Sequence, residues 1–258
     1  IPVKEQEAHD ITRKNPLSPG PYYIKEIVPG QQVIFEANPY YYKGQPKVKT
    51  VVWKIVPSAQ IVAALQAGEY DLTVSLNADL YNKVKALSNI KVGVQDDLSY
   101  SYIGFKLGKW DKAKGEAIPD PNAKMADVKL RQAMAYAIDN DLVGTKFYEG
   151  LRRNATQLMI PAFKEFYDDS IKGYTIDLEK AKQLLDEAGY KDVNGDGIRE
   201  DKNGQPFKIN FASMSGSAIA EPITNYYIQQ WKLIGLDVQL TNGRLIEFNS
   251  FYEKVQAD

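Results

Sequence analysis

Residues 207–241 read FKINFASMSGSAIAEPITNYYIQQWKLIGLDVQLT. Residues 207–212 alternate apolar and polar side chains and predict a strand, and a serine-rich loop over 213–217 follows. A helical pattern over about 218–234 and a second β-rich run over 236–241 complete the stretch. A strand, a helix and a strand in this order predict a compact βαβ unit with parallel strands and a right-handed crossover.

A similar alternation of elements precedes this unit in the chain. Residues 22–27 and 32–37 predict two strands joined by a tight turn, and residues 51–56 predict a third. The run over 51–56 and the alternating elements after it predict a substantially parallel sheet with right-handed helical crossovers. The other elements expected here are a helix over 59–67 with Ser58 as its N-cap and Gly68 at its end, a strand over 71–75, a helix over 79–87, and strands over 90–94 and 100–107.

A charged, proline-containing stretch over residues 108–124 interrupts the alternation. It is either a surface loop or a crossover between two lobes, and we favour the crossover because new apolar helices follow it. Asp127 and Asp177 are the expected N-caps of two of these helices, the second over 178–188. We therefore expect part of a first, sheet-containing lobe over 1–107, a hinge over 108–126, and part of a second α/β lobe over 127–258.

The composition excludes several classes of function. The 258 residues are 44% hydrophobic and 25% charged, which is typical of globular proteins. The net charge of −1 argues against a nucleic-acid-binding protein, since that class needs clustered Lys and Arg. The absence of cysteine and the single histidine, His9, argue against thiol chemistry, Ser-His-Asp hydrolysis and multi-histidine metal sites. No apolar run approaches the ~18–20 residues that span a bilayer.

Residues 192–203 read DVNGDGIREDKN and resemble a calcium-binding loop. Such a loop needs oxygen ligands at alternate positions and a glycine at its sixth position, where the chain turns sharply. The loop departs from this pattern at its end, where Asn203 replaces the expected bidentate glutamate. The alternative is a hairpin loop whose side chains bind their own backbone. Calcium is thus the candidate cofactor, and its candidate ligands are Asp192, Asn194, Asp196 and Glu200.

The serine-rich loop between the strand and the helix of the βαβ unit is a candidate ligand site. Ser213, Ser215 and Ser217 lie where ligands bind in open α/β sheets, at the carboxyl end of a strand. The adjacent helix N-terminus favours a carboxylate or a phosphate. The alternative is an ordinary serine-capped loop.

A second candidate site lies just before the predicted hinge. Tyr100, Ser101 and Tyr102 belong to a predicted strand that would present aromatic surface and main-chain groups to an extended ligand. The alternative is a strand of the core. Carboxylate pairs are also plentiful, but the spacing in sequence identifies no catalytic pair, so we assign no catalytic residue.

Six short blocks of the chain form an ordered set of motifs. They are GPYYIKEIVPGQ (20–31), FEANPYYY (35–42), AALQAGEYD (63–71), DVKLRQAMAYAID (127–139), AKQLLDEAGY (181–190) and IGLDV (234–238). In sequence and in order along most of the chain, these blocks resemble the peptide-type extracellular solute-binding proteins of family 5, which serve ABC importers of oligopeptides and dipeptides.

The resemblance implies a two-lobed, periplasmic-binding-protein-like (type II) α/β architecture, of which this chain holds a part. It also implies a receptor, not an enzyme, that captures extracellular peptides and delivers them to a membrane permease. Such a receptor is a cell-surface lipoprotein or a periplasmic protein, with any lipid anchor outside this fragment. The family's acidic residue for the peptide amino group is expected after Asp258. The alternatives are a receptor of the same fold for a nickel chelate, haem, a sugar oligomer or a signalling peptide and, more remotely, a carboxylate-dependent hydrolase.

Overall fold

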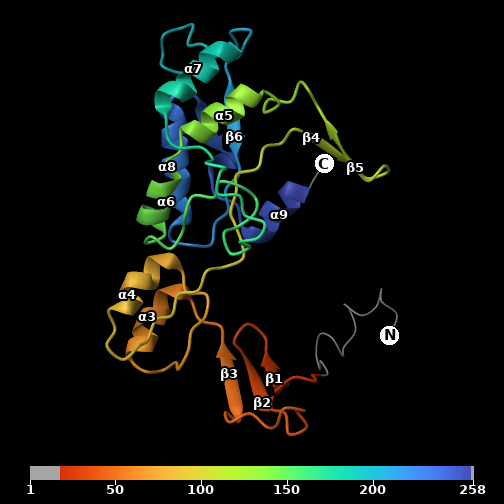
Figure 1. The fold of residues 1–258 in the computed structure, drawn as a ribbon, viewed down its shortest axis with the longest axis vertical. Coiled ribbons are helices and arrows are strands. Elements are labelled where there is room, and N and C mark those ends of the chain that lie inside the picture. Colours follow the sequence, from red (N-terminus) through yellow and green to blue (C-terminus); the bar gives the residue numbers. More distant parts are fainter. Residues whose placement is uncertain (1–17, 257–258) are drawn as a thin grey trace. The chain divides into compact units, whose positions relative to one another are not determined.

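The computed structural model describes residues 18–256 of the chain (Figure 1). Its contacts divide the chain into two compact units, Ile1–Thr73 and Val74–Asp258. The boundary between the units, at residues 73 and 74, precedes the predicted hinge over 108–126 in the sequence. The predicted boundaries of the two lobes stay a prediction. His9 lies outside the described residues.

The first unit contains an antiparallel sheet of three strands. β1 (Tyr22–Val28) and β2 (Gln32–Ala37) make the predicted hairpin, and β3 (Thr50–Lys54) pairs with the other side of β2. Gly30 in the hairpin turn has a φ of 72°, a left-handed conformation that glycine adopts without a Cβ clash. Turn chemistry and strand alternation together therefore predicted this sheet correctly up to its third strand.

Two predicted helices in this part of the chain are present. α3 (Ser58–Gln66) covers the first, and η1 (Ala78–Leu80) followed by α4 (Tyr81–Lys85) covers the second. The prediction of Ser58 as N-cap is wrong, because Pro57 takes the cap position and Ser58 is already the first helical residue. Pro57 has a φ of −58°, which the proline ring permits, and its side chain makes no capping hydrogen bond.

The prediction of a substantially parallel sheet formed by the elements over residues 51–107 is wrong. The sheet of β1, β2 and β3 is antiparallel, and the predicted strands over 71–75, 90–94 and 100–107 are irregular. A strand needs a neighbour that takes up its N–H and C=O groups. No strand within residues 18–256 pairs with these segments. An alternating pattern predicts the faces of a strand but not the presence of its partner.

The charged stretch after residue 107 forms an antiparallel hairpin of β4 (Gly108–Asp111) and β5 (Glu116–Pro119). A side chain at Gly108 would collide with the backbone of Ile118 on the facing strand, so the pairing requires glycine there. The carboxylate of Asp111 accepts two backbone N–H groups of the turn, at 2.9 and 3.2 Å. The stretch is therefore ordered by its own hydrogen bonds.

Three capped helices follow this hairpin in the second unit. They are α5 (Val128–Tyr136), α6 (Asn140–Phe147) and α7 (Leu178–Ala188). Each begins after an aspartate whose side chain accepts backbone N–H groups of the first turn. The predicted caps Asp127 and Asp177 are confirmed.

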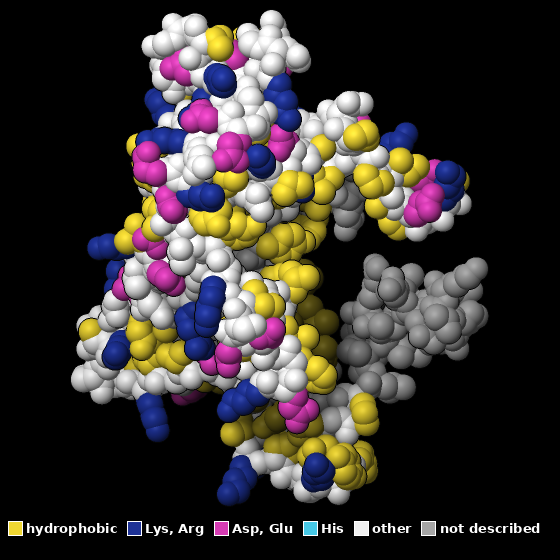
Figure 2. Space-filling model, turned by 45° about the horizontal axis from the view of Figure 1, so that its top comes forward, with side chains coloured by type: hydrophobic (Ala, Val, Ile, Leu, Met, Phe, Trp, Pro, Cys, Tyr) yellow, Lys and Arg dark blue, Asp and Glu magenta, His cyan; other side chains and the backbone are white. Residues whose placement is uncertain are grey.

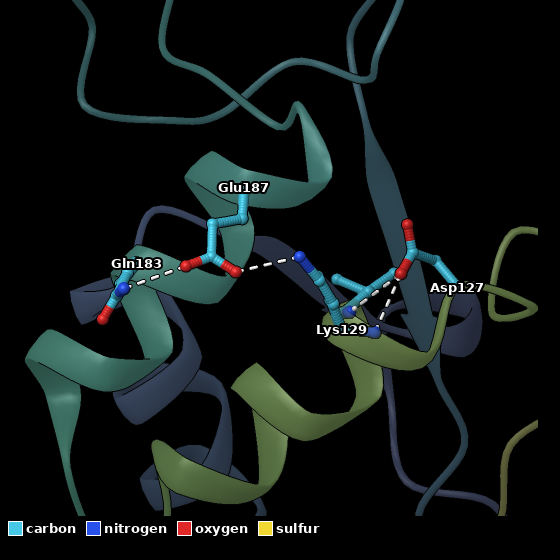
Figure 3. Close-up of polar contacts among 5 residues, drawn as sticks. Asp127, Lys129, Gln183 and Glu187 are labelled. Carbon is cyan, nitrogen blue, oxygen red and sulfur yellow. Dashed lines mark hydrogen bonds and ion pairs between the residues drawn. The ribbon is translucent and has the colours of Figure 1, made fainter.

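Polar contacts tie α5 to α7 (Figure 3). The Nζ of Lys129 lies 2.9 Å from Oε2 of Glu187, and Gln183 donates to the other carboxylate oxygen at 2.9 Å. Burial acts to raise the pKa of the Asp127 carboxyl, but the ion pair with Lys202 (2.6 Å) and two backbone N–H groups outweigh it and lower the pKa. Exposed pairs such as Lys129–Glu187 contribute only about 0.2–1 kcal/mol, so the apolar contacts beneath them dominate.

The predicted βαβ unit forms the centre of the core. β6 (Lys208–Phe211) and β7 (Asp237–Leu240) pair in parallel, and α8 (Ala220–Leu233) connects them. Trp231 on α8 is 1% exposed, and its indole N–H donates to the C=O of Met134 at 3.1 Å. Helices α5, α7 and α8 and both strands share one buried cluster: Met125, Leu130, Ala133, Met134, Ala137, Ile138, Ala181, Leu184, Leu185, Tyr190, Phe207, Ile209, Trp231, Ile234, Leu236 and Val238.

The surface shown in Figure 2 carries Lys and Arg side chains interspersed with Asp and Glu. This mixture agrees with the formal net charge of −1. Within the described residues, none of the helices is both long and apolar enough to cross a membrane.

Candidate functional site

The loop after β6 is joined to the segment that leads into α9 (Phe248–Gln256). Met214 and Ile246 form a parallel bridge. The N–H of Ser215 donates to the C=O of Ile246 at 2.8 Å, and the N–H of Ile246 donates to the C=O of Ser213 at 2.9 Å. Two segments about thirty residues apart therefore lie side by side at the carboxyl end of the parallel pair, the edge where α/β sheets bind ligands.

The three candidate serines of this loop have different environments. The hydroxyl of Ser213 lies 2.7 Å from that of Thr224, a buried residue of α8. The hydroxyl of Ser215 donates to the C=O of Ile246 at 3.2 Å, and Ser217 accepts the N–H of the first residue of α8 through its carbonyl. Ser213 is thus tied to the interior, whereas Ser215 lines a pocket.

That pocket has a volume of about 390 Å³ and lies entirely within the second unit. One wall is η2 (Thr241–Gly243), which follows β7 directly. Asn242 in this turn has a φ of 58°, a conformation that Asn tolerates better than most residues. The lining residues are Ser215, Thr241, Asn242, Arg244, Leu245, Ile246, Glu247, Ser250 and Lys254.

The second candidate site, Tyr100 to Tyr102, is surface-exposed and irregular. The rings of Tyr100 and Tyr102 lie 6.0 Å apart, and Tyr102 is 78% exposed. The hydroxyl of Ser101 accepts a hydrogen bond from the guanidinium of Arg152 at 3.1 Å, and this guanidinium lies 3.8 Å above the ring of Tyr148. Across residues 18–256, no hydrogen bond or ring contact joins these three residues to the serine loop.

The proposed calcium loop is held together by its own backbone. The carboxylate of Asp192 accepts the N–H groups of Gly195 (2.7 Å) and Gly197 (2.8 Å). These bonds, the one from Gly197 first, lower the pKa of Asp192. The side-chain oxygens of Asn194 and Asp196 each accept the N–H two residues on, at 2.8 Å.

Glu200, the fourth proposed ligand, lies inside this loop and is 6% exposed. Its carboxylate accepts the N–H of Val193 at 2.9 Å and the side-chain amide of Asn194 at 2.7 Å. These are the contacts that a self-bonded loop needs. In the described part of the chain, no group of three or more His, Cys, Asp or Glu could hold a metal ion. Calcium binding stays a prediction, and a melting temperature that millimolar calcium leaves unchanged would contradict it.

A family model describes the whole of this architecture. The model of the bacterial extracellular solute-binding proteins, family 5 Middle, matches residues 1–257. The chain belongs to this family. The expected fold class, part of a two-lobed type II α/β architecture, is thereby confirmed.

Individual members of family 5 match almost the whole chain. The oligopeptide-binding protein OppA of Lactococcus lactis subsp. lactis is 39% identical over 239 residues, which are 92% of this chain and 40% of that protein. The structure of lactococcal OppA, complexed with an endogenous peptide in the closed conformation, matches with a TM-score of 0.89 and 37% identity over 97% of this chain and 46% of that one. AppA from Bacillus subtilis, in complex with a nonapeptide, matches with a TM-score of 0.75 and 30% identity over 98% of this chain and 47% of that one. The chain thus spans less than half the length of these family members.

Sequence reasoning did not find most of the pocket. It named Ser215 but missed Asn242, Arg244 and Lys254. The Asn-Gly pair at 242–243 directly after a strand is a turn signal that could have indicated the wall of the pocket. The sequence around Arg244 and Lys254 contains no such signal, because only the tertiary fold brings these two residues beside Ser215.

Proposed function

We propose that this chain is part of the receptor component of an ABC importer, which captures extracellular oligopeptides and delivers them to a membrane permease. The observation that carries the proposal is the close match to the lactococcal structure that holds a peptide. The pocket at the carboxyl ends of β6 and β7 supports it, because it offers a place for part of an extended ligand.

The location and partners of the receptor follow from the same proposal. The family is one of extracellular proteins. We infer a cell-surface lipoprotein or periplasmic protein whose lipid anchor lies outside these residues and whose partners are permease subunits. The receptor returns its ligand unchanged, so no catalytic role is assigned to any residue.

Calorimetric titration of the full-length protein with peptides of several lengths tests this function. We expect saturable binding of one peptide per receptor. Mass spectrometry of ligand that co-purifies with the protein identifies the natural cargo. Haem, a nickel chelate or a sugar oligomer as the bound species, together with no heat from any peptide, would contradict the proposal.

Contacts with the peptide are proposed for Tyr100, Ser101, Tyr102, Ser213, Ser215 and Ser217. Two of these serines, Ser213 and Ser215, have different surroundings, which supports different expectations for their substitution. Ser215→Ala removes a hydroxyl from the pocket wall and should change peptide affinity, whereas Ser213→Ala breaks the contact with Thr224 and should mainly lower stability. In the exposed tyrosine pair, Tyr102→Ala should weaken peptide binding, and Tyr40→Ala, at a tyrosine that is also largely exposed, is the matched control.

A further inference from the structure

The segment over residues 95–102, which carries the exposed tyrosine pair, has little structure of its own. Among residues 18–256, none of its N–H or C=O groups forms a backbone–backbone hydrogen bond. The carboxylate of Asp97 accepts the N–H of Leu98 and the hydroxyl of Ser99, both at 2.7 Å, but these bonds lie within the segment. The position of the segment therefore depends on side-chain contacts with other parts of the chain.

Two consecutive arginines tie this segment to the turn that follows α6. The guanidinium of Arg152 donates to the hydroxyl of Ser101 at 3.1 Å. The guanidinium of Arg153 forms an ion pair with the carboxylate of Asp96 at 3.0 Å. That of Arg152 also lies 3.8 Å above the ring of Tyr148, and this stacking favours one orientation of its planar fork of donors. The two contacts therefore hold the segment near both of its ends.

The turn that presents these arginines is itself held firmly on α6. Glu149 and Gly150 have left-handed φ values of 52° and 75°, and the N–H of Gly150 donates to the C=O of Gly144 at 2.9 Å. A Cβ at Gly144 would lie 2.3 Å from the carbonyl oxygen of Arg152, so the chain packs directly on the helix because residue 144 is glycine. The arginines thus extend from a fixed base, which a tether requires.

We propose that Arg152 and Arg153 are positioning residues that hold the exposed tyrosine pair where a peptide ligand contacts it. Neither arginine is assigned a contact with the peptide itself. The inference rests on the proposed function and makes it more specific. A segment that is ordered before the peptide arrives loses less conformational entropy on binding, so the tether should raise the affinity for the peptide.

Calorimetry on the full-length receptor, with the tightest-binding peptide of the length series, measures the effect on affinity. Arg152→Gln and Arg153→Gln each remove one contact and should each weaken binding about 2- to 5-fold. Asp96→Asn should weaken binding as much as Arg153→Gln does, and the two changes together should weaken it no further, because both break the same ion pair. Arg153→Lys keeps that ion pair and should bind nearly as tightly as the wild type.

Two further measurements separate positioning from a general loss of stability. In a receptor that carries both Tyr100→Ala and Tyr102→Ala, the arginine variants should have little further effect on affinity, because they act through these tyrosines. Chymotrypsin cleaves after aromatic residues, and without peptide it should cut the arginine variants faster than the wild type after Tyr100 and Tyr102 but not elsewhere. Lys146→Gln is the matched control, because it removes a positive charge from an exposed side chain in the last turn of α6; it should change neither affinity nor cleavage.

The outcomes distinguish this role from the function on which it rests. Additive effects of the arginine and tyrosine changes would overturn the positioning role, because the arginines would then act independently of the tyrosine pair. Faster cleavage with unchanged affinity, or weaker binding with unchanged cleavage, would overturn it as well, while peptide binding itself stands. If no peptide bound the wild-type receptor, the proposed function would fail and the positioning role with it.

Discussion

The sheet of the first unit and the βαβ unit of the second have similar sequence patterns but very different burial. All five residues of β3 are exposed, including Val52 and Trp53. On β6 and β7, by contrast, Ile209 and Val238 are buried, and Trp231 packs beneath them in the same cluster. Burial of apolar surface is the main source of stability. Alternation therefore identifies a strand, whereas the contribution of that strand to stability depends on the side chains that cover it.

The two tryptophans give the largest expected effect. Trp231→Ala should lower the free energy of unfolding by about 3–5 kcal/mol, because it opens a cavity in the core. The C=O of Met134 also loses its donor. Trp53 is 59% exposed, so Trp53→Ala should cost no more than about 0.5–1 kcal/mol. Guanidinium unfolding of the full-length protein, followed by far-UV circular dichroism, measures both values.

Equal losses at the two tryptophans would contradict the comparison. They would mean that β3 is covered by other parts of the full-length protein as completely as the βαβ core is by its own helices.

Glu200 should give the next largest effect, because it is a buried carboxylate with two defined donors. Glu200→Ala leaves the N–H of Val193 and the amide of Asn194 without their acceptor, at a cost of about 1–3 kcal/mol. Glu200→Gln keeps one acceptor oxygen and should lose less. Glu165→Ala, at an exposed glutamate, is the control and should be nearly neutral. A loss no larger than that of the control would show that the loop does not depend on Glu200.

Much of the fold could be predicted wherever the signal is local. The hairpin of β1 and β2, the caps Asp127 and Asp177, and the left-handed Gly189 that ends α7 all follow from residues adjacent in sequence. The βαβ unit also follows, because its helix and two strands are consecutive and short connections place them together. Local propensity and tertiary packing agree at these positions.

The rest depends on contacts between segments far apart in the chain. Residues 100–107 have the pattern of a strand, yet they are irregular because no strand of the described residues pairs with them. The pocket joins residue 215 to residues 241–254, and a bridge from Met214 to Ile246 holds them together. The hydrophobic periodicity within each segment does not predict that the two segments lie side by side. For this reason the sequence indicated the edge of the sheet at which this pocket lies but not Arg244 or Lys254.

Alkaline pH should give the next largest effect, because a half-buried phenol, that of Tyr227, packs against the core of the second unit. Burial is the main cause that raises the pKa of Tyr227 to about 12. The unfolded chain loses this proton near pH 10, so folding stability is fully present below about pH 10 and falls as pH rises toward 12, by about 2 kcal/mol. Tyr227→Phe should flatten that part of the pH profile. Tyr40→Phe, at an exposed tyrosine, should leave it unchanged.

Asp127 should give the smallest effect, and it tests polar links against packing within the second unit. Its lowered pKa means that its ionised form stabilises the fold at pH values above the unfolded pKa of about 3.9, and that this contribution is lost as pH falls through the folded pKa. Asp127→Asn still caps α5 but loses the charge that pairs with Lys202, so it should cost about 0.5–1 kcal/mol at pH 7. The difference in melting temperature between wild type and variant should close as the pH falls below about 4. Asp177→Asn is the control, because within the described residues Asp177 caps α7 without an ion pair. If the difference in melting temperature between wild type and Asp127→Asn persisted in acid, the Asp127 side chain would act through packing or capping and not through its charge.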